Sequence, residues 1–299
     1  RAKVNATTDE TARLGFSNSA ASSTSFADDA VAVVMGDEQV YLANKGGVNL
    51  VSHYKLEETT TTDANQFKAS GYLDTGKLNQ AVSMYGNAAG TEGSTLTFNR
   101  GNQISGNNYE NINTNQGTIS FWVKPDWDWN DNKWHQIYRG HTSADYFSIN
   151  KLDSTYNNAF KFQIYGGSGN ISATNYGLGW TSGTWHHVIA RWDWDNTVDG
   201  TSYIQMYIDG VATAGSASPA AGSPYAPSDI QVIGNNALSG NKPSNALIDD
   251  FAIYDRVLST TEIADLYNSG TGREAGYVAD SSLKFYAKLD GTGTLQPVT

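Results

Sequence analysis

The sequence predicts an all-β protein, a two-sheet antiparallel sandwich or jelly roll, and three observations support this fold class. Short stretches alternate apolar and polar side chains with a period of two, clusters of Gly and Asn separate these stretches, and one segment alone has a convincing helical pattern. Alternation of this kind is typical of antiparallel strands with one buried face. Many short strands joined by such turns favour a sandwich or a jelly roll.

The alternation is clearest in residues 118–124, 203–209 and 247–254. In the second stretch, Ile204 and Ile208 lie on one face and Tyr and Gln side chains lie on the other, as side chains alternate along a strand. We therefore expect all three stretches to be half-buried strands of the sandwich.

The single predicted helix begins after Ser259. Ser259 and Glu262 have the spacing of a capping box, in which each side chain bonds the other residue's backbone amide. Apolar residues follow at the spacing of one helical face, and Gly270 occurs where a C-terminal cap belongs. We expect one short C-terminal helix packed on the sandwich.

The chain divides into three segments by composition. Residues 1–47 are rich in Ala, Ser, Thr and Asp and contain no Trp, and residues 30–42 predict a hairpin around Gly36 and Asp37. We expect this segment to be extended or to form shaft-like strands. Residues 48–272 have the sandwich pattern and are expected to form one domain.

The end of the chain repeats an earlier pattern. Residues 283–290 (LKFYAKLD) echo residues 50–57 (LVSHYKLE), and both are strand-like. We therefore interpret residues 273–299 as a linker followed by the first strand of a possible second copy, and the chain as a part of something longer. Because the match is short, chance similarity is an alternative.

Charge and composition exclude several classes of partner. The chain has 30 acidic and 19 basic residues, a formal net charge of −11, and no Cys. Binding to nucleic acid requires basic side chains against the phosphates, so we expect no nucleic acid partner. No apolar run is long enough to span a bilayer, so we expect no membrane insertion. We expect the protein to be extracellular, on a cell surface or on a virion surface.

Three sequence blocks carry a resemblance to a known family. They are residues 117–125 (GTISFWVKP), residues 183–188 (GTWHHV) with residues 207–210 (YIDG), and residues 248–259 (IDDFAIYDRVLS). In this order they resemble the LamG-like superfamily of concanavalin A-like jelly rolls, over about residues 48–272. The resemblance implies a concanavalin A-like fold. It says less about the ligand, because the fold hosts lectins, adhesion modules, hydrolases and inert spacers.

A loop after Pro125 combines indole rings with carboxylates (DWDWNDNKW). Indole faces stack on the C–H faces of sugar rings, and carboxylates accept hydrogen bonds from hydroxyls, so the loop is a candidate glycan site. The alternative is that one or two of these Trp residues cover the edge of the sandwich. The candidate ligand-binding residues are Trp127, Trp129, Trp134, Asp126, Asp128 and Asp131.

The resemblance also implies a structural calcium ion. The Asp at the position of Asp249 often binds calcium in related jelly rolls, together with backbone carbonyls of the first strand, which would be near Lys55–Glu57 here; Asp249 and Glu57 are therefore the candidate metal residues. From the alternation, Asp249 lies on the face of Phe251 and Ile253, where a carboxylate needs a partner. The alternative is a carboxylate capped by backbone amides or by Arg256.

The residue patterns of known enzymes of this fold are missing. Hydrolases of this fold place their carboxylates on one strand as Glu-x-Asp-x-x-Glu or Glu-x-Asp-x-Glu, and the sequence contains neither spacing. We therefore predict no enzyme but a non-catalytic glycan-binding or adhesion module of a larger extracellular or surface-exposed protein. A first alternative is a structural component of an assembly, such as a virion fibre, a decoration protein or a surface filament, in contact with other copies of itself. A second is an enzyme with atypical carboxylates.

Overall fold

The computed structural model describes the backbone of strands β1–β8 and, with side chains, most of the chain from residue 75 to residue 289. The fully described ranges are 75–84, 96–140, 147–167, 169–196, 200, 203–216, 222–235, 242–278 and 280–289. By their contacts, strands β1–β6 belong to one compact unit and β7–β23 to another.

The second unit is a sandwich of two antiparallel sheets. One sheet has seven strands in the order β17-β16-β15-β14-β21-β10-β7. Their bounds are β7 (Lys68–Ala69), β10 (Leu96–Asn99), β14 (His135–Arg139), β15 (Phe147–Lys151), β16 (Phe160–Gly166), β17 (Gly169–Asn175) and β21 (Ile230–Ile233).

The facing sheet has eight strands, in the order β20-β19-β18-β13-β22-β9-β8 with β23 also paired to β22. Its strands are β8 (Tyr72–Thr75), β9 (Gln80–Met84), β13 (Gln116–Pro125), β18 (His186–Asp193), β19 (Ile204–Ile208), β20 (Val211–Ser216), β22 (Ala246–Tyr254) and β23 (Leu283–Ala287). The three strands predicted from alternation are thus confirmed as β13, β19 and β22.

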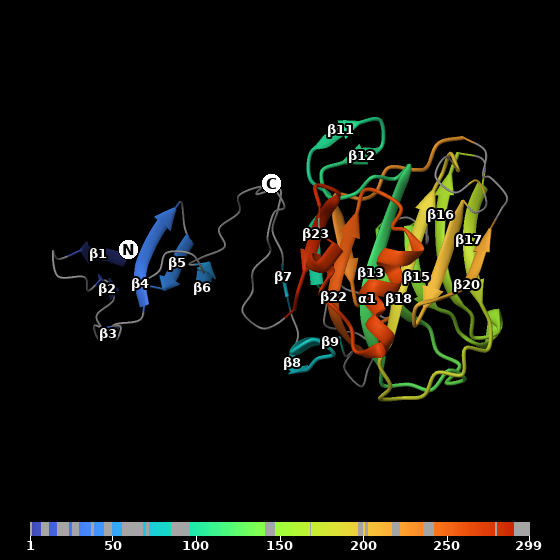
Figure 1. Ribbon diagram of the computed structural model, residues 1–299, viewed down its shortest axis with the longest axis horizontal. Coiled ribbons are helices and arrows are strands. Elements are labelled where there is room, and N and C mark those ends of the chain that lie inside the picture. Colours follow the sequence, from blue (N-terminus) through green and yellow to red (C-terminus); the bar gives the residue numbers. More distant parts are fainter. Residues whose placement is uncertain are drawn as a thin grey trace. The chain divides into compact units, whose positions relative to one another are not determined.

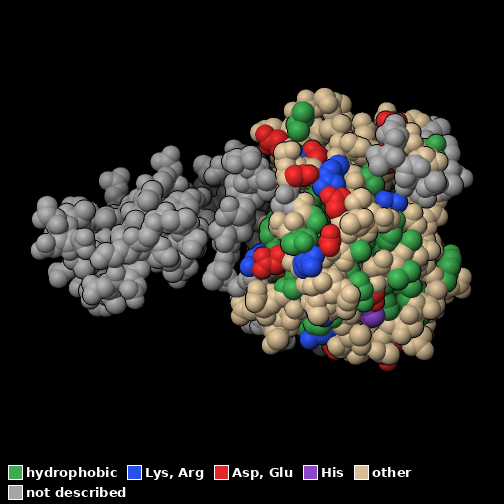
Figure 2. Space-filling view, viewed as in Figure 1, with side chains coloured by type: hydrophobic (Ala, Val, Ile, Leu, Met, Phe, Trp, Pro, Cys, Tyr) green, Lys and Arg blue, Asp and Glu red, His purple; other side chains and the backbone are tan. Residues whose placement is uncertain are grey.

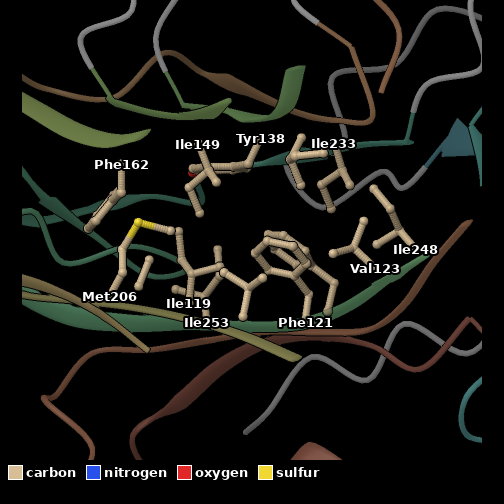
Figure 3. Packing of buried hydrophobic residues seen from close by; sticks show 14 of the residues in the cluster. Ile119, Phe121, Val123, Tyr138, Ile149, Phe162, Met206, Ile233, Ile248 and Ile253 are labelled. Atoms are coloured by element: carbon tan, nitrogen blue, oxygen red, sulfur yellow. The ribbon is translucent and has the colours of Figure 1, made fainter. Parts of the chain in front are cut away.

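The hydrophobic core lies between these sheets. Figure 3 shows Tyr138, Ile149 and Phe162 of the seven-stranded sheet facing Phe121 and Met206 of the eight-stranded sheet. All five side chains belong to one cluster of buried residues and have no exposed surface. The alternation in the sequence marks the same positions because only one face of each strand meets the core.

The predicted helix is confirmed as α1 (Thr260–Tyr267). Ser259 accepts a hydrogen bond from the Glu262 amide and Glu262 accepts one from the Ser259 amide, so the capping box forms as expected. The helix ends earlier than predicted, at Asn268, which takes the left-handed conformation in place of Gly270. No helix in the described part of the chain is long and apolar enough to cross a membrane.

Helix α1 covers the outer face of the eight-stranded sheet (Figure 1), where Ile263 and Leu266 pack on Ile189 and Tyr254.

The small hairpin of β11 (Gln103–Ser105) and β12 (Asn108–Tyr109) projects from one end of the sandwich. Three 3₁₀ turns complete the described elements: η1 (Ser154–Tyr156), η2 (Asn268–Gly270) and η3 (Ala275–Val278).

A bulge in β22 changes the face on which Asp249 lies. Ser120 pairs with Ala252 but Trp122 pairs with Asp249, and Asp250 has a positive φ of 52°. The extra residue reverses the alternation, so Phe251 belongs to the core between the sheets and Asp249 shares the outer face with Ala252. The predicted placement of Asp249 beside Phe251 and Ile253 is therefore corrected.

Strand β23 is part of this sandwich. It pairs antiparallel with β22, and Phe285 stacks on Phe98 with ring centroids 3.8 Å apart. Ala287 is buried in the same core as Phe285, whereas Leu283, which pairs with Tyr254 beyond a bulge, is buried in the cluster on the outer face of the sheet. The expectation that residues 273–299 begin a second copy is corrected at this strand, because its apolar face completes the core already described.

The first unit contains two three-stranded sheets. One is formed by β1 (Ala2–Ala6), β2 (Ala12–Phe16) and β3 (Thr24–Ser25), and the other by β4 (Ala30–Gly36), β5 (Gln39–Asn44) and β6 (Leu50–Lys55). Pairing of β4 with β5 confirms the predicted hairpin. Because β6 pairs with β5, the boundary expected at residue 48 falls inside this sheet.

Candidate functional site

The Trp- and Asp-rich loop connects β13 to β14, and two of its indoles are buried. Trp127 is 5% exposed and Trp129 is 8% exposed. The Trp127 ring stacks on His135, with centroids 4.8 Å apart, and also on Trp180, and its Nε1 donates to the Ser244 carbonyl. The expectation that these two rings stack on sugar is corrected, because other side chains already cover them.

At the base of the loop lies a network of three ionisable side chains, Asp131, His135 and Lys151. Asp131 Oδ1 accepts from Lys151 Nζ, and Asp131 Oδ2 lies 2.7 Å from His135 Nε2. His135 Nδ1 lies 3.2 Å from the Pro243 carbonyl. Both partners of His135 are acceptors, so the imidazole satisfies both only when it carries a proton on each nitrogen. Lys151 has no exposed surface, so its ammonium depends on Asp131 for compensation.

Asp131 is committed to this network. Burial alone would raise its pKa, but hydrogen bonds from His135, Lys151 and the Lys133 amide lower the pKa to about 2. The carboxylate is thus ionised and its charge is compensated inside the protein. It is one of the candidate ligand-binding residues, and the structure gives it a supporting position under the loop.

Asp126 and Asp128 are exposed at the start of the loop. The Ser182 amide donates to Asp128 Oδ1 at 2.9 Å, and Ser182 Oγ lies 3.4 Å from Asp126 Oδ1. These contacts join the loop to the segment before β18. Of the three predicted acidic residues, these two lie on the surface.

Trp134 is the loop indole that is only half-buried, and its ring contacts an exposed tyrosine that is not among the candidate residues. Tyr156 in η1 is 54% exposed, and its ring stands at 85° to Trp134 with centroids 6.2 Å apart. We call this pair the aromatic corner. No sequence pattern links the two residues, because Tyr156 lies in a different segment, the connection between β15 and β16.

The two segments that carry the aromatic corner are tied together from below. Lys151 Nζ donates to the Lys133 carbonyl and to Asn158 Oδ1, both at 3.0 Å. Asn158 Nδ2 in turn donates to Asn132 Oδ1 at 3.1 Å. The two segments are therefore held in place before a ligand binds, which lowers the entropy cost of ordering them on binding.

The surroundings of Asp249 match the amide-capped alternative. Asp249 is fully buried, and its Oδ2 accepts from the Lys77 and Leu78 amides at 2.9 and 2.8 Å. Arg256 instead pairs with Glu262 and Asp280. Glu57 lies outside the described residues, and among those described no three His, Cys, Asp or Glu side chains group as a metal site. These residues alone supply too few oxygens for calcium, which takes six to eight.

Asp250, the bulge residue, is also held by the fold. It accepts hydrogen bonds from the Tyr286 hydroxyl at 2.5 Å and from the Ala275 amide at 2.9 Å. Burial, together with the neighbouring Asp249 charge, raises the pKa of Asp250 to about 7 in spite of these bonds. Its two partners belong to β23 and η3, so this carboxylate fastens both segments to β22.

Comparison with known families places the described sandwich within one group. A model of the concanavalin A-like lectin/glucanases superfamily (Laminin_G_3) matches residues 98–264. No curated protein matches the chain in sequence.

Solved structures that resemble the chain have low sequence identity to it. The binding domain of botulinum neurotoxin serotype D has 15% identity and a TM-score of 0.50, over 77% of this chain and 48% of that one. The binding domain of botulinum neurotoxin DC in complex with SialylT has 14% identity and a TM-score of 0.50, over 78% and 52%. Domain 4 of an extracellular arabinanase from Geobacillus stearothermophilus, in complex with arabinotriose, has 16% identity and a TM-score of 0.40, over 68% and 82%. The chain thus spans about half the length of the two toxin domains, and the likeness concerns the fold.

Proposed function

The chain belongs to the concanavalin A-like lectin/glucanases superfamily, and from this premise we propose that it is a non-catalytic glycan-binding module of a larger extracellular or surface-exposed protein. The observation that carries the proposal is the aromatic corner of Trp134 and Tyr156. An exposed ring beside a half-buried one offers apolar surface to the C–H face of a sugar ring, as aromatic side chains do in binding sites.

Polar groups beside the corner suit hydroxyl recognition. Asn132 is exposed and Asn158 is half-buried, and each carboxamide has donors and an acceptor. Asp126 and Asp128, in the same loop, add exposed carboxylates. Apolar stacking with a few polar groups to fix orientation is the usual composition of a small-ligand site.

A glycan array followed by calorimetry tests the proposal. We expect Trp134→Ala and Tyr156→Ala each to weaken binding about tenfold or more, since burial of an aromatic side chain contributes on the order of 1.5–3 kcal/mol. Tyr176 and Tyr277 are 64% and 60% exposed, so Tyr176→Ala and Tyr277→Ala are matched controls that should bind like the wild type.

Two outcomes would reject the proposal. One is that no carbohydrate on the array is bound. The other is binding that both corner variants leave unchanged, because the site would then lie elsewhere. The non-catalytic part has its own test: release of reducing sugar from a polysaccharide that the protein binds would assign it to the enzymes.

Calcium at Asp249 is a separate part of the proposal. It requires Glu57 and first-strand oxygens in addition to Asp249, whose Oδ2 already accepts two amides. A rise in melting temperature with added calcium that is lost in both Asp249→Asn and Glu57→Gln would support it. A melting temperature that is insensitive to both calcium and a chelator would reject it.

A second candidate function is a structural part of an assembly. Its supporting observation is that β1–β6 form two three-stranded sheets with strands of two to seven residues. Sheets this small are marginally stable unless something packs on them, and other copies of the chain could supply that surface. Light scattering separates the two functions: a mass several times that of one chain favours the assembly, and a monomer contradicts it.

A further inference from the structure

A lysine lies directly on one face of the aromatic corner. Lys242 Nζ is 3.4 Å from the centroid of the Trp134 ring. Lys242 is half-buried and comes from the segment before β22, far from Trp134 in the chain. The contact therefore places a positive charge beside the two rings to which we assign sugar stacking.

This ammonium has no acidic partner among the described residues. Lys151, Lys284 and Lys288 each form an ion pair with a carboxylate. The Lys242 side chain instead contacts the ring of Trp134. Asp131, the carboxylate at the base of the same loop, already pairs with Lys151 and His135. A cation over an aromatic face retains its capacity to donate to an incoming anion.

A second lysine without an acidic partner among the described residues is the neighbour of Trp134 in the chain. Lys133, which directly precedes Trp134, is exposed, and its described contacts are made by its backbone. Lys242 thus places one ammonium group on the Trp134 ring, and Lys133 adds a second basic residue to the same loop, in a chain whose net charge is −11. The overall charge would repel polyanions, so retention of an anion here would depend on these local cations.

We propose that the aromatic corner selects sugars that carry a carboxylate, such as uronic or sialic acids, with Lys242 as the specificity-determining residue. The sugar's C–H face packs against Tyr156 while its carboxylate accepts hydrogen bonds from the Lys242 ammonium. A charge-assisted bond of this kind is stronger than one between neutral groups, so it distinguishes acidic from neutral rings. This inference rests on the proposed glycan-binding function.

The test uses pairs of ligands that differ in charge. Oligogalacturonate and its methyl ester share one backbone, and sialyllactose and lactose differ by the acidic sugar. We expect the full chain to bind at least one acidic member about tenfold or more tightly than its neutral counterpart, and more weakly as salt is added. Lys242→Gln should remove this preference. Lys77 lies over Trp122 at 4.8 Å, away from the corner, so Lys77→Gln is the matched control and should retain it.

The outcomes separate the inference from the function on which it rests. Equal binding of charged and neutral members that Trp134→Ala abolishes would overturn the role of Lys242 and leave glycan binding in place. A preference for acidic sugars that Lys242→Gln leaves unchanged would also overturn it. Absence of binding to any member of either pair, and to the wider array, would overturn both.

Discussion

At the scale of single residues, Lys151 connects stability to the candidate site. Its ammonium is fully buried and contacts Asp131, the Lys133 carbonyl and Asn158. Two loops that are separate in the chain therefore share one buried cation. A buried ammonium group is tolerated here because it donates to three acceptors, one of them a carboxylate.

We expect Lys151→Met to destabilise the fold by about 3 kcal/mol, because it leaves the partly buried Asp131 without one of its two charge-bearing side-chain partners. The same variant should weaken glycan binding, since the base of the aromatic corner is lost. Chemical denaturation measures the first effect and calorimetry the second. Lys124→Met is the control, because Lys124 is half-buried over Trp185 and lies outside this network. A Lys151→Met protein as stable as the control would contradict the role assigned to the network.

At the scale of elements, helix α1 is anchored by local chemistry. The Ser259 hydroxyl and the Glu262 carboxylate cap the first turn, and Arg256 pairs with Glu262. Figure 2 shows acidic and basic side chains next to one another on the face that carries α1 and β23. These contacts join α1 and β23 to the residues that follow β22.

We expect Ser259→Ala to lower the stability by about 1 kcal/mol, because the Glu262 amide loses its acceptor. Ser259→Thr keeps a hydroxyl at this position and should remain close to the wild type. Thermal or urea unfolding of the two variants measures the difference. Equal losses in both would show that the hydroxyl does not cap the helix.

Strand β23 is the element for which sequence and structure disagree most. We expect Phe285→Ala to cost about 3 kcal/mol, since it removes a ring packed between Phe98 and Phe251 and leaves a cavity. Lys284→Ala, on the other face of the strand, should change the stability by less than about 0.5 kcal/mol. If both substitutions were harmless, β23 would not belong to this core.

At the scale of the whole molecule, His187 and Asp131 make the stability of the sandwich depend on pH. Burial lowers the pKa of His187 to about 3, although the nearby Asp209 charge opposes the shift. The unfolded chain takes up this proton near pH 6.5, so the stabilisation from neutral His187 is complete above about pH 6.5 and is lost as the pH falls toward 3. Ionised Asp131, with its pKa near 2, contributes above about pH 4 and is lost below it.

We therefore expect that, as the pH falls from 6.5 to 4, the wild type loses stability relative to His187→Gln by on the order of 1 kcal/mol per pH unit, while the opposite contribution of Asp250, whose pKa is raised to about 7, is the same in both proteins. Denaturant unfolding across this range measures the slopes. An imidazole NMR titration of His187 gives an independent check, since a midpoint near 6.5 in the folded protein would contradict the buried, neutral assignment.

Much of the architecture was predictable because its signals are local. Alternation located β13, β19 and β22, and the capping box located α1. The bulge at Asp250 was not predictable from alternation, since one extra residue in the left-handed conformation reverses the faces of a strand without disturbing its composition. The role of β23 was also missed, because its apolar face is the same whether it completes this core or another.

For the candidate site, the sequence by itself determined the loop and its chemistry, indoles among carboxylates after β13. Only the tertiary structure decided which rings are covered: Trp127 and Trp129 are buried against Trp180, and Trp134 is left at the surface with Tyr156. The physical reason is that burial depends on which distant segments pack against a side chain. Residues close in the sequence determine where a strand alternates and where a helix is capped. Residues that become close only in the folded protein determine how exposed a side chain is, how its pKa shifts, and that Lys242 lies on the Trp134 ring.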